Sequence, residues 1–325
     1  PNIQNQKSIL LYRLNRGSPS AEIYFNEALS LLSTSDNISI ENPKATFGEL
    51  TAETNIRSKI TALVHFGRSG TGLLHSLIDG QSEISTLPST YFSEFFDQST
   101  WKKIIAGGWE NMADCFASTY EVLFDGSSST PVPSDSSTLA RHLGHKEGLA
   151  NLGEQRDEIF SVDKQSFLEE LNCLMACYDR LDAVTFFKLV HSAFDKALND
   201  RDDKNLIFFH IHNPSIYAQL NFLKSAPDTK WLMMVREPVQ SCESWIISSF
   251  REPDYENVVI RIFQMLFEID NIIYRNKNSI GVRLEDLKDR PTKTIPALCA
   301  WLGIKEEDSL YEMTAQGKKW WGDPA

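Results

Sequence analysis

A short glycine-rich segment near residue 70 carries the residue types best suited to chemistry. The apolar run Thr61–Phe66 stops at Gly-Arg-Ser-Gly-Thr-Gly, residues 67–72, and a leucine-rich stretch follows. This order predicts a strand, a tight turn and the first turn of a helix, where free backbone N–H groups and the positive end of the helix dipole point at one place. Arg68 adds a cation, and Ser69 and Thr71 add hydroxyl donors. The segment therefore predicts a site for a phosphate or sulfate group.

The residues after the last glycine argue against a nucleoside triphosphatase. A P-loop of the form G-x-x-x-x-G-K-[ST] needs a Lys for the β- and γ-phosphates and a hydroxyl for magnesium. Leu73 and Leu74 stand at those two positions. The dinucleotide pattern G-x-G-x-x-G does not fit this register either. The segment keeps an anion-binding backbone but lacks the residues for ATP or GTP hydrolysis.

The run Arg-Ser-Gly-Thr-Gly-Leu-Leu, residues 68–74, resembles the 5′-phosphosulfate loop of sulfotransferases that use 3′-phosphoadenosine-5′-phosphosulfate (PAPS). The usual form of that loop is [K/R]-S-G-T-T-x-L. Gly72 stands where the second Thr would be, which removes one hydroxyl donor and no backbone amide. The resemblance implies that the 5′-phosphosulfate is held by Arg68, Ser69, Gly70, Thr71, Gly72 and Leu73.

A second segment resembles the 3′-phosphate motif of the same family. The apolar run 231–235 ends at Arg236, a helical stretch follows Pro238, and Ser244 lies eight residues after the arginine. Arginine supplies a planar fork that matches phosphate oxygens, and serine supplies a neutral donor. The resemblance implies that Arg236 and Ser244 grip the ribose 3′-phosphate. The alternative is a surface ion pair of Arg236 with Glu237.

The segment Gly281–Gly303 resembles the family's R-Y-E-D-L sequence and the proline-containing helix after it. Asp289 and Thr292 are candidate N-caps of this helix. Its apolar positions recur at helical spacing and predict a buried face made by Ile295, Leu298, Cys299 and Leu302. We expect this segment to be scaffold.

The C-terminal run Gly317–Asp323 resembles the basic, tryptophan-containing segment that closes over the nucleotide in many family members. The resemblance implies that Lys318 or Lys319 reaches the 3′-phosphate, and that Trp320 or Trp321 covers the adenine. The alternative is that the paired tryptophans anchor the chain to the core.

The candidate general base follows a strand predicted over Leu206–Ile211. His210 and His212 are two residues apart and would point to one face of the strand. The segment resembles K-T-H-L-P of the cytosolic sulfotransferases, with His212 over their catalytic histidine and His210 over their lysine. A neutral imidazole, with a pKa near ~6.5, could take the proton of an acceptor hydroxyl. The alternatives are a His-x-His metal pair and a histidine whose hydrogen bonds are satisfied at the sheet end.

A carboxylate is the other candidate base. Glu94 lies where several carbohydrate- and tyrosine-type sulfotransferases place an acidic base. The alternatives are that Glu94 orients the acceptor or that it only lies on an amphipathic helix. His142, His145 and Glu147 resemble a zinc cluster in composition only, because their segment is polar and broken by glycines. No metal is expected.

The length of the chain allows one domain or two unequal lobes. The resemblance implies a single α/β domain with the P-loop-like sulfotransferase fold, in which helices flank a central parallel sheet. The chain's 325 residues are 42% hydrophobic, enough for a large core. We expect an N-terminal extension over residues 1–58, a nucleotide-binding core over 59–100 and 201–325, and a mostly helical acceptor-binding insertion over 101–200. Within these parts, we expect a strand at Ser8–Leu14, a helix at Ser20–Leu32 with Ile23 facing inward, a low-complexity loop at Asp125–Thr138 and a core helix at Tyr255–Arg275.

The charge and cysteine content limit the partners. A net charge of −12 argues against nucleic acid or an anionic membrane, and no apolar run approaches the ~20 residues of a membrane span. Five scattered cysteines, an odd number without a disulfide or zinc pattern, indicate a reducing, cytoplasmic setting.

Together these segments imply a PAPS-dependent sulfotransferase that acts on an acceptor hydroxyl without a metal. The acceptor would be a small molecule or an acyl chain tethered to a carrier protein, as in bacterial polyketide pathways. A P-loop-type phosphotransferase and a catalytically inactive nucleotide-binding module are the alternatives.

Overall fold

The computed structural model describes most of the chain. The described residues are 3–15, 18–31, 38–44, 57–65, 68–88, 93–128, 150–198, 204–211, 216–249, 259 and 278–322. Apart from residue 259, the predicted helix over Tyr255–Arg275 lies outside them. Residues 129–138 of the low-complexity loop and the His142–Glu147 segment also lie outside them.

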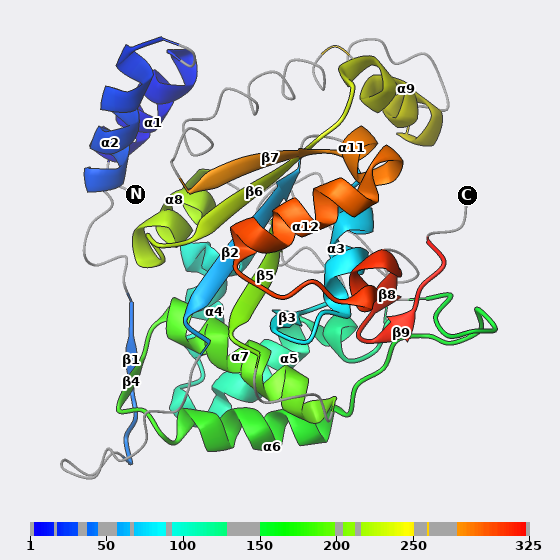
Figure 1. Ribbon diagram of the computed structural model, residues 1–325. Coiled ribbons are helices and arrows are strands. Elements are labelled where there is room, and N and C mark those ends of the chain that lie inside the picture. Colours follow the sequence, from blue (N-terminus) through cyan, green and yellow to red (C-terminus); the bar gives the residue numbers. More distant parts are fainter. Residues whose placement is uncertain are drawn as a thin grey trace.

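A parallel five-stranded sheet forms the centre of the fold (Figure 1). Its strands lie in the order β3-β5-β2-β6-β7. Their bounds are Lys59–His65 for β2, Ile84–Thr86 for β3, Leu206–Ile211 for β5, Lys230–Val235 for β6 and Ser279–Arg283 for β7. Every neighbouring pair is parallel, which confirms the predicted α/β class.

The central strands are apolar because both of their faces are covered. All six residues of β5 are buried. Ile207, Phe209 and Ile211 belong to one hydrophobic cluster, whereas Leu206 and Phe208 belong to another. Alternate side chains of a strand point to opposite faces, so the two clusters are the two sides of the sheet.

Helices cover both sides of the sheet. One cluster is closed by α3 (Thr71–Asp79), α11 (Leu284–Asp289) and α12 (Pro291–Leu302). The other is larger and includes residues of α4 (Gln98–Ile105), α5 (Met112–Thr119), α6 (Lys164–Met175), α7 (Ala183–Ala197) and α8 (Ile216–Ser225). The predicted apolar face of α12 is confirmed, since Ile295, Leu298, Cys299 and Leu302 are all buried. Its N-cap is Arg290, which corrects the prediction of Asp289 or Thr292, because Pro291 is well suited to the first helical position.

The described parts of the 101–200 segment are mostly helical, as predicted. The short 3₁₀ helices Trp109–Asn111 and Glu121–Leu123 lie beside α4 to α7. Many aromatic side chains of helices α5, α6 and α7 are buried in the larger cluster, among them Phe116, Phe167, Phe186 and Phe194. Packing of this kind makes the segment part of the same core. Its role in acceptor binding stays a prediction.

The N-terminal residues form a helical hairpin of α1 (Ile3–Leu14) and α2 (Ser20–Leu31) (Figure 1). The strand predicted at Ser8–Leu14 is therefore wrong. Tyr12 packs on Phe25 with 5.3 Å between ring centroids, and this helix–helix contact decides the structure of an ambiguous apolar run. The helix predicted from Ser20 is confirmed, but Ile23 is exposed and Phe25 takes the inward position.

The remaining elements are short. β1 (Ile40–Glu41) pairs with β4 (Arg180–Leu181), and the C-terminal hairpin consists of β8 (Thr314–Ala315) and β9 (Lys318–Lys319). Helix α9 (Pro238–Ser249) follows β6. Two further 3₁₀ helices span Ser93–Phe96 and Asp308–Tyr311. None of the helices that the structure describes is long and apolar enough to cross a bilayer.

Candidate anion-binding site

The glycine loop after β2 adopts a backbone that only certain residues favour. Arg68 has a φ of 51° and Gly70 a φ of 87°. Gly70 is the N-cap of α3 and makes no side-chain capping hydrogen bond. The first N–H groups of a helix have no partner within the helix, so those of α3 can receive an anion. The start of α3 is therefore a candidate anion site, and anion binding there stays a prediction.

Gly70 is also required by its neighbour. A Cβ added at Gly70 would lie 2.6 Å from Cδ1 of Leu284, which is well inside van der Waals contact. Leu284, the first residue of α11, therefore packs directly against the loop. By contrast, a Cβ added at Gly72 meets no described atom within 4 Å. Crowding by the described residues therefore does not require a glycine at position 72.

Three of the predicted cofactor residues meet beside this loop. Nε of Arg68 donates a hydrogen bond to Oγ of Ser244 at 3.2 Å. Nη1 of Arg236 donates to the backbone oxygen of Arg68 at 3.4 Å. The side chain of Arg68 is exposed, and Arg236 and Ser244 are partly exposed. Two guanidinium groups and a hydroxyl thus share one solvent-accessible place.

Sheet topology explains this meeting. β2 and β6 are neighbours, and His65 lies opposite Met234 in their register. Both strands end at the same edge of the sheet, so the residues that follow them, Arg68 and Arg236, emerge side by side. In open α/β sheets, ligands bind at the carboxyl ends of the strands.

The turn after β6 is held from two directions. Oε2 of Glu237 accepts the N–H of Gln240 at 2.8 Å and so caps α9, which carries Ser244. Oε1 of Glu285 accepts the N–H of Glu237 at 3.0 Å. That backbone donor is the main reason why the pKa of Glu285 is lowered, and the charges of Arg283 and Arg236 lower it further. Glu285 therefore carries its negative charge at neutral pH.

The sequence prediction treated the Glu285 segment as scaffold and missed its contact with the site. The signal was present, because an acidic residue, Glu285, lies two positions after the arginine that ends β7. Arg283 lies opposite Val235 in the β6–β7 register. The residues after Arg283, including Glu285, therefore lie near Arg236, which follows Val235.

The predicted C-terminal residues lie elsewhere. β8 and β9 pack at the C-terminal end of α3, where the N–H of Gly317 donates to Oδ2 of Asp79 at 3.1 Å. α3 has nine residues and spans about 13 Å. In Figure 1, α9 and α11 lie at the upper end of α3, and β8 and β9 lie at its lower end. The structure does not bring this hairpin to Arg68.

The side chains of the hairpin have partners of their own. Lys318 pairs with Glu158 at 2.6 Å and Lys319 with Glu154 at 3.4 Å. Trp320 is buried in the larger core cluster, which agrees with the alternative that this tryptophan anchors the chain to the core. Trp321 has Arg156 and Lys319 over its ring, at 4.1 Å and 4.3 Å from the centroid. A role in nucleotide binding stays a prediction for Lys318, Lys319 and Trp320, and the contacts described above do not support it.

Neither candidate base has a described side chain. His212 lies outside the described residues, directly after β5 ends at Ile211. Ile211 lies opposite Val64 in the β2–β5 register, so β5 ends at the same sheet edge as β2. The backbone of Glu94 belongs to the 3₁₀ helix Ser93–Phe96. Both roles stay predictions.

His210 is buried and faces α3. Its ring centroid lies 6.0 Å from that of His75, and His75 also stacks on Phe208 at 6.1 Å. Burial lowers the pKa of His75, partly offset by Asp79, so this imidazole is neutral near pH 7. The residues described by the structure include no group of three or more ligating side chains that could hold a metal.

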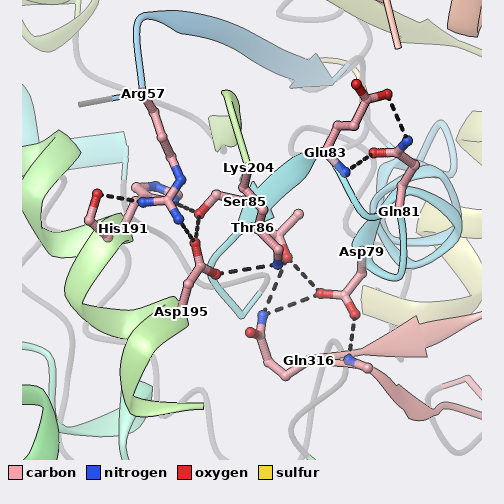
Figure 2. A network of polar contacts seen from close by, with 12 residues as sticks. Arg57, Asp79, Gln81, Glu83, Ser85, Thr86, His191, Asp195, Lys204 and Gln316 are labelled. Atoms are coloured by element: carbon pink, nitrogen blue, oxygen red, sulfur yellow. Dashed lines mark hydrogen bonds and ion pairs between the residues drawn. The ribbon is translucent and has the colours of Figure 1, made fainter. Parts of the chain in front are cut away.

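A buried ionic network surrounds Asp195 (Figure 2). Asp195 accepts a hydrogen bond from Ser85 at 2.7 Å and forms ion pairs with Arg57 at 2.5 Å and Lys204 at 3.4 Å. Oγ of Ser85 also lies 3.0 Å from Nδ1 of His191. This set has the types of a hydroxyl–imidazole–carboxylate triad, but every member is buried, and Arg57 and Lys204 precede the amino ends of β2 and β5. It joins the sheet to α7 and is closed to substrates.

Comparisons with known proteins found distant likenesses. The chain is similar to the sulfotransferase domain from the curacin biosynthetic pathway, with 14% identity over 79% of this chain and 78% of that one and a TM-score of 0.42. The sulfotransferase domain of the Synechococcus PCC 7002 olefin synthase gives 12% identity, coverages of 78% and 76%, and a TM-score of 0.44. The sulfotransferase STF9 of Mycobacterium avium gives 13% identity over 78% of this chain and 66% of that one, with a TM-score of 0.36.

No protein-family model matches the chain, and no curated protein sequence matches it. The structural likenesses are too distant to assign an activity, so the function has to be argued from the chain's own residues.

Proposed function

We propose that this chain is a sulfotransferase that moves a sulfuryl group from PAPS to an acceptor hydroxyl. The observation that carries the proposal is the meeting of Arg68, Ser244 and Arg236 beside the N-terminus of α3. These residues come from three elements and match the two phosphate motifs that the sequence resembles. A phosphate at each end of one ligand would explain why two arginines converge there.

The residues present fit such a ligand. The guanidinium group of Arg236 and the hydroxyl of Ser244 offer donors for a 3′-phosphate. Arg68 and the amides of Ser69 to Gly72 offer donors for a 5′-phosphate group. PAPS supplies a sulfuryl group on a phosphate leaving group when it is bound. Arg68 and the loop amides would stabilise the charge that grows on the departing oxygen.

The proton of the acceptor hydroxyl needs a base. We assign this role to His212, because β5 ends at the edge where Arg68 and Arg236 emerge. Glu94 is the alternative base. The proposed mechanism does not require a metal ion.

The acceptor is proposed only as a class, a hydroxyl on a small molecule or on a carrier-tethered acyl chain. The helical segment α4–α7 is the proposed source of its binding site. A cytoplasmic location is proposed as well, since all five cysteines are free thiols.

The test is calorimetric titration of the chain with 3′,5′-adenosine bisphosphate, with AMP and ATP as comparison ligands. The proposal expects the bisphosphate to bind at least tenfold more tightly than AMP, and Arg236→Ala to remove this preference. Arg290→Ala is the matched control, because Arg290 is an exposed arginine paired with Asp286 on α11. Equal affinity for the bisphosphate and AMP in the unchanged chain would refute the proposal, and magnesium-dependent ATP turnover would favour the phosphotransferase alternative.

A further inference from the structure

The carboxylate of Glu285 accepts a hydrogen bond from the turn that carries Arg236. Its Oε1 accepts the backbone N–H of Glu237, the residue directly after Arg236, at 3.0 Å. Glu285 lies in the first turn of α11, so this contact fastens the end of β6 to the segment after β7. The orientation of the peptide after Arg236 is thereby fixed by a side chain 48 residues away.

The same turn also controls the start of α9. The carboxylate of Glu237 accepts the N–H of Gln240, and the backbone oxygen of Glu237 accepts the N–H of Ser241 at 3.0 Å. α9 carries Ser244, whose Oγ accepts a hydrogen bond from Arg68. A shift of the Glu237 peptide would therefore move both Arg236 and Ser244.

Electrostatics support a carboxylate at this position. Arg283 lies 3.7 Å from Oε2 of Glu285, and Arg236 is near enough to influence its ionisation. The negative charge of Glu285 offsets part of the repulsion among the arginines at this edge. An anionic side chain would not itself bind an anionic phosphate, so any effect of Glu285 on the ligand acts through the turn and Arg236.

We propose that Glu285 is a positioning residue that holds the Arg236–Glu237 turn and thereby sets the selectivity of the site for a 3′-phosphate. The inference rests on the proposed function, because it assigns Arg236 to that phosphate. It adds a residue that the sequence prediction placed in the scaffold. Glu285 holds the turn mainly through its hydrogen bond with the Glu237 amide, and the negative charge of Glu285 contributes less.

The test compares Glu285→Ala, Glu285→Asp and Glu285→Gln. Each variant is titrated with 3′,5′-adenosine bisphosphate and with AMP, and its melting temperature is measured. Loss of one charge-assisted hydrogen bond corresponds to roughly tenfold in affinity. We expect the Ala and Asp variants to lose about tenfold of the bisphosphate-to-AMP selectivity, because the shorter Asp cannot reach the amide. The Gln variant keeps an oxygen acceptor at the same length and should stay within about threefold of the unchanged chain.

The control is Asp286→Asn, at the next residue of α11, whose carboxylate pairs with Arg290. It should leave the selectivity unchanged. A merely structural role would lower the melting temperature and both affinities together, with their ratio preserved. Unchanged selectivity in the Asp variant would overturn the inference, even if the Ala variant does not fold. If the unchanged chain itself shows no preference for the bisphosphate, the proposed function fails and the inference fails with it.

Discussion

Nε of Arg68 lies 3.2 Å from Oγ of Ser244, a residue 176 positions later in the chain. Arg68 belongs to the glycine loop, and Ser244 belongs to α9. The hydrogen bond links the proposed 5′-phosphate and 3′-phosphate motifs into one site. Ligand binding would exchange this contact for contacts with phosphate oxygens.

Removal of the Ser244 hydroxyl should weaken recognition of the 3′-phosphate selectively. We expect Ser244→Ala to reduce the affinity for 3′,5′-adenosine bisphosphate by about five- to tenfold, the usual effect of one hydrogen bond to a charged group. Affinity for AMP should change by less than about twofold. Titration calorimetry measures both, with Ser30→Ala on the exposed face of α2 as the control. An equal loss for both ligands would show that Ser244 supports the fold of α9 instead.

The two glycines of the loop should respond differently to a methyl group. Gly70→Ala places a Cβ at a positive φ and 2.6 Å from Leu284, so we expect a loss of about 1–3 kcal/mol in the free energy of unfolding. Gly72→Ala meets no described atom within 4 Å and lies in a helix, so it should be neutral or stabilising by up to about 1 kcal/mol. Urea unfolding checks both. A neutral Gly70→Ala would contradict the packing of Leu284 against the loop.

Asp195 should be among the most sensitive positions for stability. Its carboxylate faces Arg57 and Lys204 in a site where all three are buried. Asp195→Ala would leave two cations without this partner, and we expect a loss of about 3–5 kcal/mol in the free energy of unfolding. Glu110→Gln, in the exposed pair with Lys44, should cost less than about 1 kcal/mol and serves as the control. A small effect of Asp195→Ala in urea unfolding would contradict the role of the network.

Stability should fall on mild acidification because of His191. Burial, and then the charges of Arg57, Lys204 and His75, hold the pKa of His191 well below its ordinary value of 6.5. Between that value and the lower folded pKa, the unfolded chain binds a proton that the folded chain does not. The free energy of unfolding therefore decreases as pH falls below about 6.5.

Urea unfolding at pH 7.5 and pH 5.5 measures this effect. His191→Gln removes the titrating group and should reduce the difference between the two pH values. The burial-lowered pKa of His75 adds a contribution of the same sign, which His191→Gln leaves in place. An unchanged pH dependence in the variant would assign the effect to other groups.

Local sequence patterns determined the main elements of the fold. β5 begins and ends where the apolar run Leu206–Ile211 does, and α3 begins at Thr71, within the glycine segment 67–72. The buried face of α12 followed from helical spacing alone. These features depend on neighbours within a few residues, so they can be predicted without knowledge of the rest of the chain. The wrong strand at Ser8–Leu14 shows the limit, because the contact between Tyr12 and Phe25 decided that segment.

The sequence by itself also determined which residue types could form an anion site, namely the Arg68–Leu73 loop and the pair Arg236 and Ser244. Only the tertiary structure decided which of them meet. The order of strands in the sheet brings Arg68 and Arg236 to one edge, and the Glu285 contact fixes the turn between β6 and α9. The same packing places Lys318 and Lys319 at the far end of α3, paired with acidic residues. The physical reason is that such contacts join residues tens to hundreds of positions apart, and their geometry is set by the packing of whole elements against the sheet.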